Sequence, residues 1–443
     1  MSRKGEKHMN TSEIRKLHGF FEHQLTNRIL SFWMPRCEDR EYGGFLNCFD
    51  NKGETLVSHD KYTWSQGRFV WMFAKLAQTP AVMFSVNERK EFLRLAKQGA
   101  DFLMRHCLIG KEDWRCVFLM NRDGSPKKVD GWDALDMSIY ADCFAVIGLA
   151  RYALVSEDRD AYVFAKKLHA SCVERVKNNT FHTLPYPLSP KFRAHGIPMI
   201  LSNTTKELFL AAQRLDGAHA QQLQQLVRGY TQDILDHFVD EHNVLHEVIV
   251  SADNSFSPQI LGQHLNPGHT IEDAWFMYEA AELCGERGWE NRIAAVAKKA
   301  FENGWDTEYG GILHFSGVCG GQPQGDITGV EHETMTHQLS DWDSKLWWVH
   351  SEALYTSLLC YFKSGDREFL DWFEKVFDYT FETFPGQDPE IREWVQIRTR
   401  TGEPLEKVVA LPVKDPFHIT RNLILILELL HSNNKNDGKR RFS

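Results

Sequence analysis

Hydrophobic residues recur with helical spacing along almost the whole chain, and strand-like alternation between these stripes is rare. The stripes predict twelve helices, near residues 11–34, 61–79, 88–106, 138–155, 158–177, 201–215, 217–238, 269–285, 290–304, 344–364, 367–382 and 416–432. Twelve successive helices joined by alternately short and long connections suit six helical hairpins closed into a toroid. We therefore predict an all-α fold, an (α/α)6 barrel with an inner and an outer ring of helices.

No long Pro-, Gly- or Ser-rich linker divides the chain. We expect one barrel domain over residues 1–443, with flexible tails at 1–10 and 434–443. The segments EYGGFL at 41–46 and EYGGIL at 308–313 each lie in a predicted loop before a Trp-rich helix. They indicate either a repeated half-barrel or shared turn chemistry, because paired glycines mark tight turns wherever they fall.

The composition and charge of the chain limit which partners and which cellular location we expect for the protein. The 443 residues carry a net charge of -9 without a basic block long enough to follow a phosphate backbone, which argues against nucleic acid. The longest purely aliphatic run, Leu423 to Leu427, is far shorter than the ~20 residues of a membrane helix. Nine cysteines without a CxxC pair, in a chain too large to need disulfides, indicate reduced thiols. We expect a soluble, cytoplasmic protein.

Two histidines stand at matching helix starts. The segment NPGHTIEDAW, residues 266–275, combines a capping Asn, a proline suited to the first helical position and then His269. The segment DPFHITRN, residues 415–422, repeats this layout with an Asp cap and His418, 149 residues further on. In a toroid, inner helices of one sense begin at the same end, so both imidazoles could face one cavity.

Proton transfer at carbon is the chemistry that this pair suits. A helix N-terminus disfavours an imidazolium, so each ring tends to stay neutral and able to accept a proton. Two such groups on opposite faces of a planar intermediate could remove a proton from one side and return it on the other, which is epimerisation. For each histidine alone, a helix-start residue bonded to its neighbours is the alternative.

Three further charged residues could support this chemistry. Glu272 lies three residues after His269, where it could hold the ring, form half of a metal site as HxxE, or make a plain surface pair. In KLWWVHSEAL, Trp348 and Glu352 share a helix face and could shape a sugar pocket, or be a core Trp beside an exposed Glu. Arg68, next to Gly67, could bind the oxygens of an enediolate, unless it is an ordinary surface residue.

Other motifs fail on spacing. HETMTH at 332–337 separates its histidines by five residues, whereas the zinc-peptidase motif HExxH needs four. No GxxxxGK[ST] occurs, and no GxGxxG follows a predicted strand.

The segments WSQGRFVWMF, NPGHTIEDAWF, KLWWVHSEAL, DPEIREW and PFHITR, in this order from residue 64 to 421, resemble the N-acylglucosamine 2-epimerase family. That family includes cellobiose 2-epimerases and aldose–ketose isomerases. The resemblance implies an (α/α)6 barrel with a central active site and no required metal or redox cofactor. It implies that His269 and His418 are the acid/base catalysts and that Arg68 binds the sugar oxygens.

The resemblance also implies roles for residues around these three. Glu272 and Glu352 would support the histidines and the substrate hydroxyls. The substrate-binding residues would be aromatic: Trp64, Tyr140, Trp275, Trp348 and Trp394.

The resemblance favours a small sugar as the partner. The middle segment HGIPMILSNTTKEL lacks the HxHxxEA-like pattern of the isomerase and cellobiose branches, and its IPMIL run is closer to the N-acylglucosamine branch. The run REWVQIRTRTGEP departs from the Gly-Glu-Trp-Phe-Gly-type run of that branch. We expect interconversion of N-acetylglucosamine and N-acetylmannosamine, with an epimerase or isomerase of mannose or cellobiose as the close alternative. Some members use ATP as an activator, and a homodimer is expected.

Two functions from other classes remain open. An (α/α)6 barrel could be a glycoside hydrolase that uses two carboxylates, such as Glu352 with Asp341 or Asp343. It could also be a non-catalytic protein-binding scaffold.

Overall fold

Six inner helices form a closed ring in the computed structural model, which describes residues 9–79 and 83–440. They are α3 (Thr63–Gln78), α5 (Ile139–Ser156), α7 (Gly196–Leu215), α10 (Pro267–Cys284), α13 (Trp347–Ser364) and α15 (Phe417–Arg440). Each packs on the next, and α15 packs on α3, which closes the ring. The predicted (α/α)6 barrel is therefore confirmed. Of the tails predicted at 1–10 and 434–443, residues 1–8 and 441–443 fall outside the described residues, whereas Asn10 caps α1 and α15 continues to Arg440.

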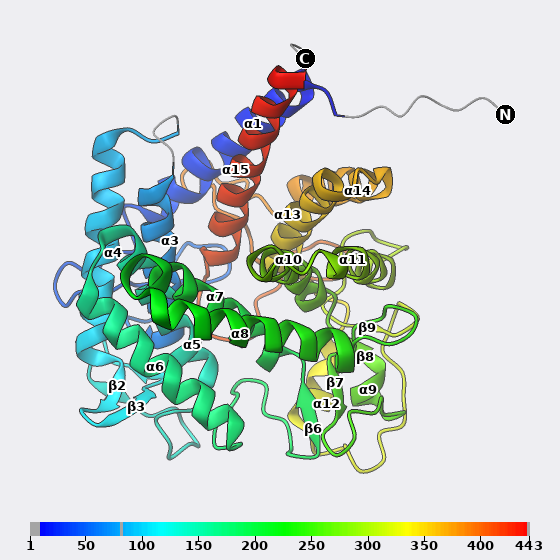
Figure 1. The fold of residues 1–443 in the computed structure, drawn as a ribbon, viewed down its shortest axis with the longest axis horizontal. Coiled ribbons are helices and arrows are strands. Elements are labelled where there is room, and N and C mark those ends of the chain that lie inside the picture. The colour runs from blue at the N-terminus through cyan, green and yellow to red at the C-terminus, as the bar shows by residue number, and fades with distance from the viewer. Residues whose placement is uncertain (1–8, 80–82, 441–443) are drawn as a thin grey trace.

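Each inner helix pairs with an outer helix. The outer helices are α1 (Thr11–His23), α4 (Val86–His106), α6 (Arg159–Lys177), α8 (Gly217–Asp233), α11 (Glu290–Gly304) and α14 (Arg367–Thr383). Five hairpins join consecutive helices, whereas α1 packs on α15, so the two ends of the chain complete the sixth (Figure 1). Helix α1 continues through a π-helical segment, Gln24–Leu30, and α2 (Ser31–Trp33), and α8 continues through Ile234–Phe238.

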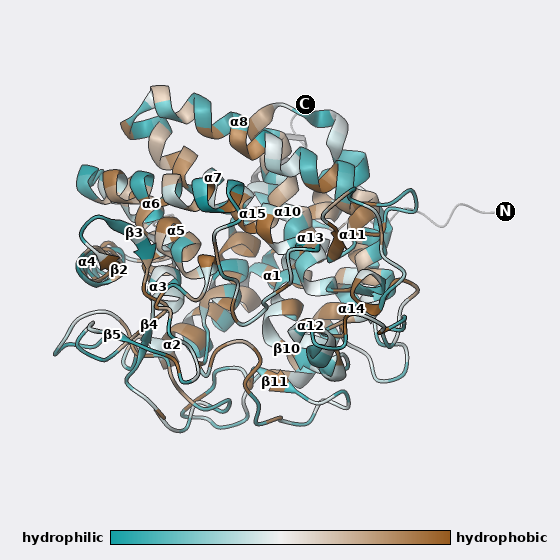
Figure 2. Ribbon diagram, turned by 90° about the horizontal axis from the view of Figure 1, so that it is seen from below, coloured by the Kyte–Doolittle hydropathy of each residue, from teal (hydrophilic) through white to brown (hydrophobic). Residues whose placement is uncertain are grey.

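Burial distinguishes the two rings. The inner helices α5, α10 and α13 are buried on nearly every side, whereas outer helices such as α4 and α14 bury one stripe and expose the rest. Helix α5 is long and apolar enough to cross a membrane, but 78% of it is buried inside the barrel. Figure 2 shows the hydrophilic stretches of the outer helix α8.

The strands are short and lie in the connections between helices. Within the described residues they form five small antiparallel sheets: β1 (Lys61–Tyr62) with β4 (Leu119–Met120) and β5 (Pro126–Lys127), β2 (Leu108–Gly110) with β3 (Asp113–Cys116), β6 (Phe192–Ala194) with β7 (Val248–Val250), β8 (His264–Leu265) with β9 (Ser316–Gly317), and β10 (Lys345–Leu346) with β11 (Ile397–Arg398). Short helices α9 (Ile260–Gln263) and α12 (Thr334–Gln338) lie near β6 to β9 (Figure 1).

The loop that contains EYGGFL is held by a buried ion cluster. Asp39 accepts hydrogen bonds from Lys61 Nζ, at 2.9 Å, and from Arg122 Nε, at 3.0 Å. The same Lys61 ammonium donates to the carbonyl oxygen of Gly43 at 2.5 Å. The loop is therefore tied to the strand that precedes α3.

The loop that contains EYGGIL repeats this cluster. Asp306 accepts from Lys345 Nζ, at 2.9 Å, and from Arg400 Nε, at 2.8 Å, while Lys345 also donates to Gly310 O at 2.7 Å. In both loops the aspartate binds a lysine and an arginine that are distant from the glycines in sequence. The two loops are therefore a repeated structural unit, which shared turn chemistry alone would not produce. Burial lowers the pKa of Lys345 to about 8, so this ammonium depends on Asp306 for its charge.

Helix α7 begins five residues earlier than the predicted residue 201, at Gly196. Pro198 lies in the first turn, where proline is tolerated because the amide groups have no intrahelical partner. The extra turn brings Gly196, Met199 and Ile200 to the centre of the barrel.

Replacing Asp306 by Ala should lower the free energy of unfolding by about 3–5 kcal/mol, because it leaves the fully buried Lys345 without its carboxylate. Urea denaturation followed by circular dichroism measures this. Glu308→Ala is the matched control, since its side chain in the same loop is 59% exposed. If the two substitutions lower the free energy of unfolding equally, the claim that Asp306 stabilises the buried Lys345 is contradicted.

Candidate active site

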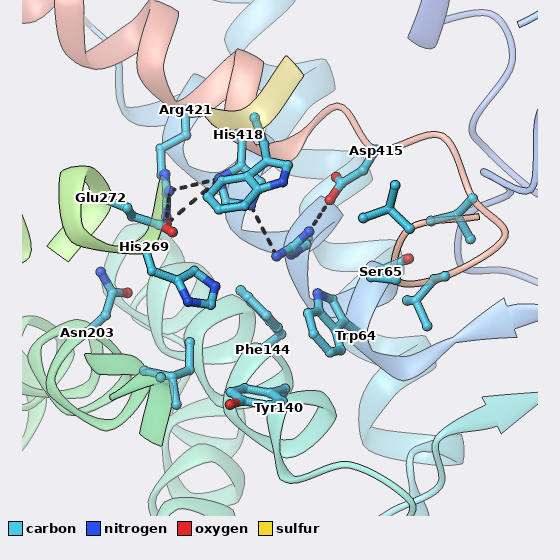
Figure 3. A pocket seen from close by; sticks show the side chains of 18 of the residues that line it. Trp64, Ser65, Tyr140, Phe144, Asn203, His269, Glu272, Asp415, His418 and Arg421 are labelled. Atoms are coloured by element: carbon cyan, nitrogen blue, oxygen red, sulfur yellow. Dashed lines mark hydrogen bonds and ion pairs between the residues drawn. The ribbon is translucent and has the colours of Figure 1, made fainter. Parts of the chain in front are cut away.

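A cavity opens at the centre of the barrel, where the inner helices α10 and α15 begin. Its volume, with the open solvent at its mouth included, is about 1130 Å³. The predicted residues Trp64, Arg68, Tyr140, His269, Glu272, Trp348 and His418 all line it. Figure 3 shows His269 and His418 on its wall, with Trp64 and Tyr140 across the space from His418.

His269 is held at the start of α10. The side chain of Asn266 accepts a hydrogen bond from the His269 amide at 3.1 Å, and Pro267 occupies the first helical position, as predicted. The ring nitrogen Nδ1 lies 2.9 Å from Glu247 Oε1. Since an ionised carboxylate only accepts, Nδ1 carries the hydrogen and Nε2 is left for a substrate.

His418 is held in the same way at the start of α15. Asp415 caps the helix by accepting from the Phe417 amide at 2.8 Å. Nδ1 of His418 lies 2.7 Å from Glu352 Oε1 and so donates to it. Nε2 lies 3.2 Å from Arg68 Nη2 and, because a guanidinium only donates, Nε2 is the unprotonated acceptor. In this tautomer the unprotonated Nε2, which contacts Arg68, is the nitrogen that can act as a base in the cavity.

The indole of Trp348 brings the two imidazoles together. Its ring centroid lies 5.6 Å from that of His269 and 5.4 Å from that of His418. Gly268 permits this packing, since a Cβ there would lie 2.5 Å from the indole. Two helix starts that are 149 residues apart in sequence thus present their imidazoles to one cavity.

Arg68 forms the cationic part of the wall. A Cβ on the neighbouring Gly67 would lie 2.1 Å from Phe144 O, so only glycine allows α3 to approach α5 this closely. The guanidinium then lies 4.1 Å from the centroid of Phe144 and donates to Asp415 Oδ2. These contacts fix a planar donor next to His418, ready for the oxygens of a substrate.

Arg421 links the two carboxylates behind His418. It donates to Glu272 and, at 2.5 Å, to Glu352 Oε1, while Trp275 Nε1 donates to Glu352 Oε2 at 2.8 Å. Burial alone would raise the pKa of Glu352, but Arg421 and His418 lower it to about 2. The prediction that Glu272 holds His269 is therefore wrong, because Glu272 accepts from Arg421 instead.

The carboxylate that does hold His269 was not predicted. Glu247 directly precedes strand β7, and His195 directly follows strand β6. Because these two strands pair antiparallel, Glu247 and His195 lie side by side. His195 Nε2 lies 2.8 Å from Asp273 Oδ2, and its Nδ1 lies 3.6 Å from Glu247 Oε2. Burial by itself would lower the pKa of His195, but the hydrogen bond to Asp273 and the nearby negative charge of Glu247 raise it to about 9. A buried, protonated His195 thus balances the charge of Glu247.

Two predicted pocket residues do not line the cavity. Trp275 is 2% exposed and lies behind Glu352, to which it donates. Trp394 is fully buried between Phe381 and Phe384, at ring distances of 5.7 and 5.9 Å. Both indoles belong to the packed wall instead of the binding surface.

The carboxylate pair of a glycoside hydrolase does not form at this site. Glu352 is fully buried and bonded to His418, and neither Asp341 nor Asp343 lines the cavity. Asp341 instead pairs with Lys407.

Two groups in the described chain have donor atoms close enough to hold a metal ion. One is His195, Glu247 and His269, and the other is Glu272, Glu352 and His418, each with ligand atoms within 4.8 Å of one another. In the second group, Arg421 already donates to both Glu272 and Glu352.

Comparison with known proteins identifies the family of this chain. The N-acylglucosamine 2-epimerase (GlcNAc 2-epimerase) family matches residues 43–421, which include both histidines. The chain belongs to the N-acylglucosamine 2-epimerase family. The enzyme is thus a carbohydrate epimerase or isomerase.

Two proteins of similar sequence and one solved structure illustrate what this chain resembles. The N-acylglucosamine 2-epimerase of Mus musculus is 31% identical over 412 residues, which cover 92% of this chain and 90% of the mouse protein. The cellobiose 2-epimerase of Bacteroides fragilis is 25% identical over 78% of this chain and 82% of its own. A solved cellobiose 2-epimerase from Bacillus thermoamylovorans shares the fold, with a TM-score of 0.73 at 19% identity, over 94% of this chain and 99% of its own.

The substitution Glu247→Gln should lower kcat by about 10²-fold or more, because the amide no longer fixes the tautomer and orientation of His269. KM should change little, since Glu247 contacts Nδ1 of His269 and not the Nε2 that is left for the substrate. Steady-state kinetics measure both constants, and Glu241→Gln, with an 87% exposed side chain, is the control. A kcat within twofold of the unmodified enzyme would contradict the role of Glu247.

The raised pKa of His195 predicts how stability depends on pH. The contribution of its ion pairs is fully present below its usual pKa of 6.5 and is lost as the pH rises through about 9. The stability advantage of the unmodified protein over His195→Gln should therefore fall by on the order of 3 kcal/mol from pH ~6 to pH ~9.5. Chemical denaturation at several pH values measures it. An advantage that stays constant would show that His195 is neutral in the folded protein.

Proposed function

We propose that this enzyme interconverts N-acetylglucosamine and N-acetylmannosamine by moving the proton at C2. The observation that supports this most is the matched pair of imidazoles. Each donates Nδ1–H to a buried carboxylate, and each keeps Nε2 for the same cavity. Such a pair suits removal of a proton from one face of a carbon and its return on the other.

The reaction proceeds on the open-chain sugar. Nε2 of one histidine takes the C2 proton, and the electrons of the C–H bond form a C1–C2 double bond while negative charge develops on O1. Arg68, fixed beside His418, donates to O1 and stabilises that charge. The other histidine, which has taken up a proton at Nε2 from water, donates that proton to the opposite face of C2, and the first histidine then releases its proton to water. The two rings exchange roles in the reverse direction.

The relatives support an N-acylated sugar over a disaccharide. Identity to the mouse N-acylglucosamine 2-epimerase is 31% over 92% of the chain, against 25% over 78% for the Bacteroides fragilis cellobiose 2-epimerase. The start of α7 adds the apolar side chains of Met199 and Ile200 to the cavity, which suits a methyl-bearing substituent.

The proposed chemistry needs no metal or redox cofactor. Proton transfer between two bases changes no oxidation state, and the guanidinium of Arg68 supplies the positive charge that a metal ion would supply elsewhere.

Isotope exchange tests the two-base mechanism. In heavy water the unmodified enzyme should place deuterium at C2 of the product. Replacing His269 or His418 by Ala should lower interconversion by about 10²–10⁴-fold, because each removes one of the two bases. Each variant should still exchange the C2 proton of one epimer, a different one for each variant. Proton NMR follows both processes.

His242→Ala serves as the control, because that side chain is 76% exposed. Full interconversion in either active-site variant would contradict the mechanism, as would product without deuterium. Turnover of mannose or cellobiose in preference to the N-acetylated sugars would contradict the proposed substrate.

A further inference from the structure

Helix α7 presents one amide to the cavity. Asn203 lines it and is only 5% exposed, yet its side chain makes no hydrogen bond within the described chain. It is also the only Asn or Gln among the described lining residues. Because Asn203 lines the cavity and is not bonded within the described chain, its donor and acceptor are available for a ligand.

The charged groups of the cavity are already engaged with one another. Arg68 pairs with Asp415, His418 with Glu352, and Arg421 with Glu272. These charged groups can interact with the reacting carbon atoms and the hydroxyl groups of the sugar. Asn203 offers what they lack, which is a neutral donor and acceptor side by side, the complement of another amide.

Apolar side chains lie on the same helix one turn before Asn203. Met199 and Ile200 both line the cavity and are 6% and 9% exposed. An amide next to a small apolar surface matches an acyl-amino group, which has a polar N–H and C=O and an apolar methyl.

Figure 3 places Asn203 on the side of the cavity where His269 and Glu272 lie. A sugar bound next to His269 is therefore within the part of the cavity that Asn203 lines. The run at residues 392–404, which differs from the family pattern, offers no equivalent surface, since only Ile397 of that run lines the cavity. Glu393 there pairs instead with the buried Lys414.

We propose that Asn203 recognises the N-acyl group of the substrate, with its Nδ2–H donating to the acyl oxygen and its Oδ1 accepting from the acyl N–H. Met199 and Ile200 form the wall against the acyl methyl. Asn203 is thus a specificity-determining residue. This inference rests on the proposed epimerisation of an N-acylated sugar.

The substitution Asn203→Leu keeps the size of the side chain and removes both hydrogen-bonding groups. It should raise KM for N-acetylmannosamine, and weaken inhibition by the open-chain N-acetylglucosaminitol, by about tenfold or more, with a smaller change in kcat. Ser202→Ala is the matched control on the same turn, because Ser202 is buried away from the cavity and contacts Thr231 at 3.4 Å.

A second variant tests the acyl wall without touching the amide. Met199→Ala should raise kcat/KM for N-propanoylmannosamine relative to N-acetylmannosamine several-fold, because it makes room for one more methylene. This measurement remains decisive if Asn203→Leu does not fold.

The outcomes separate the two claims. Unmodified enzyme that neither epimerises N-acetylmannosamine nor exchanges its C2 proton would overturn the proposed function, and this inference with it. Active unmodified enzyme, with KM and inhibition within twofold in Asn203→Leu or an unchanged acyl preference in Met199→Ala, would overturn the inference alone.

Discussion

The hydrogen bond from each active-site imidazole to a buried carboxylate is the interaction on which the rest of the site depends. Glu247 and Glu352 fix which nitrogen of each ring carries the hydrogen and which one faces the substrate. A buried carboxylate is costly unless a positive charge and hydrogen bonds compensate it. His195 compensates Glu247, and Arg421 compensates Glu352. Much of the charge inside the barrel therefore serves to keep two rings in defined tautomers.

The barrel explains how residues so far apart in sequence meet at one carbon. Inner helices of the same sense begin at the same end, so capped first turns on α10 and α15 point into one cavity. The repeated clusters at Lys61 and Lys345 tie the preceding loops to α3 and α13, the inner helices that supply Arg68 and Trp348. Close packing of α3 on α5 at Gly67 completes the wall. Fold and chemistry are thus set by the same few contacts.

Helical periodicity and capping chemistry were readable in the sequence because both are local. They predicted the twelve helices and the two histidine-bearing helix starts. Glu247, His195 and Asn203 were missed because their roles come from contacts across the ring, for which no local pattern exists. The assignment of Glu272 to His269 was wrong for a related reason, since spacing along a helix does not reveal a competing arginine on another helix. Trp394 shows that an aromatic residue in a recognisable segment can face the core and not the cavity.

The most direct test of the account is a crystal structure with N-acetylglucosaminitol, the reduced open-chain substrate, bound in the cavity. The account predicts C2 between Nε2 of His269 and Nε2 of His418, with the two rings on opposite faces and the guanidinium of Arg68 at O1. Both imidazoles on the same face of C2, or one of them out of contact with the ligand, would contradict it.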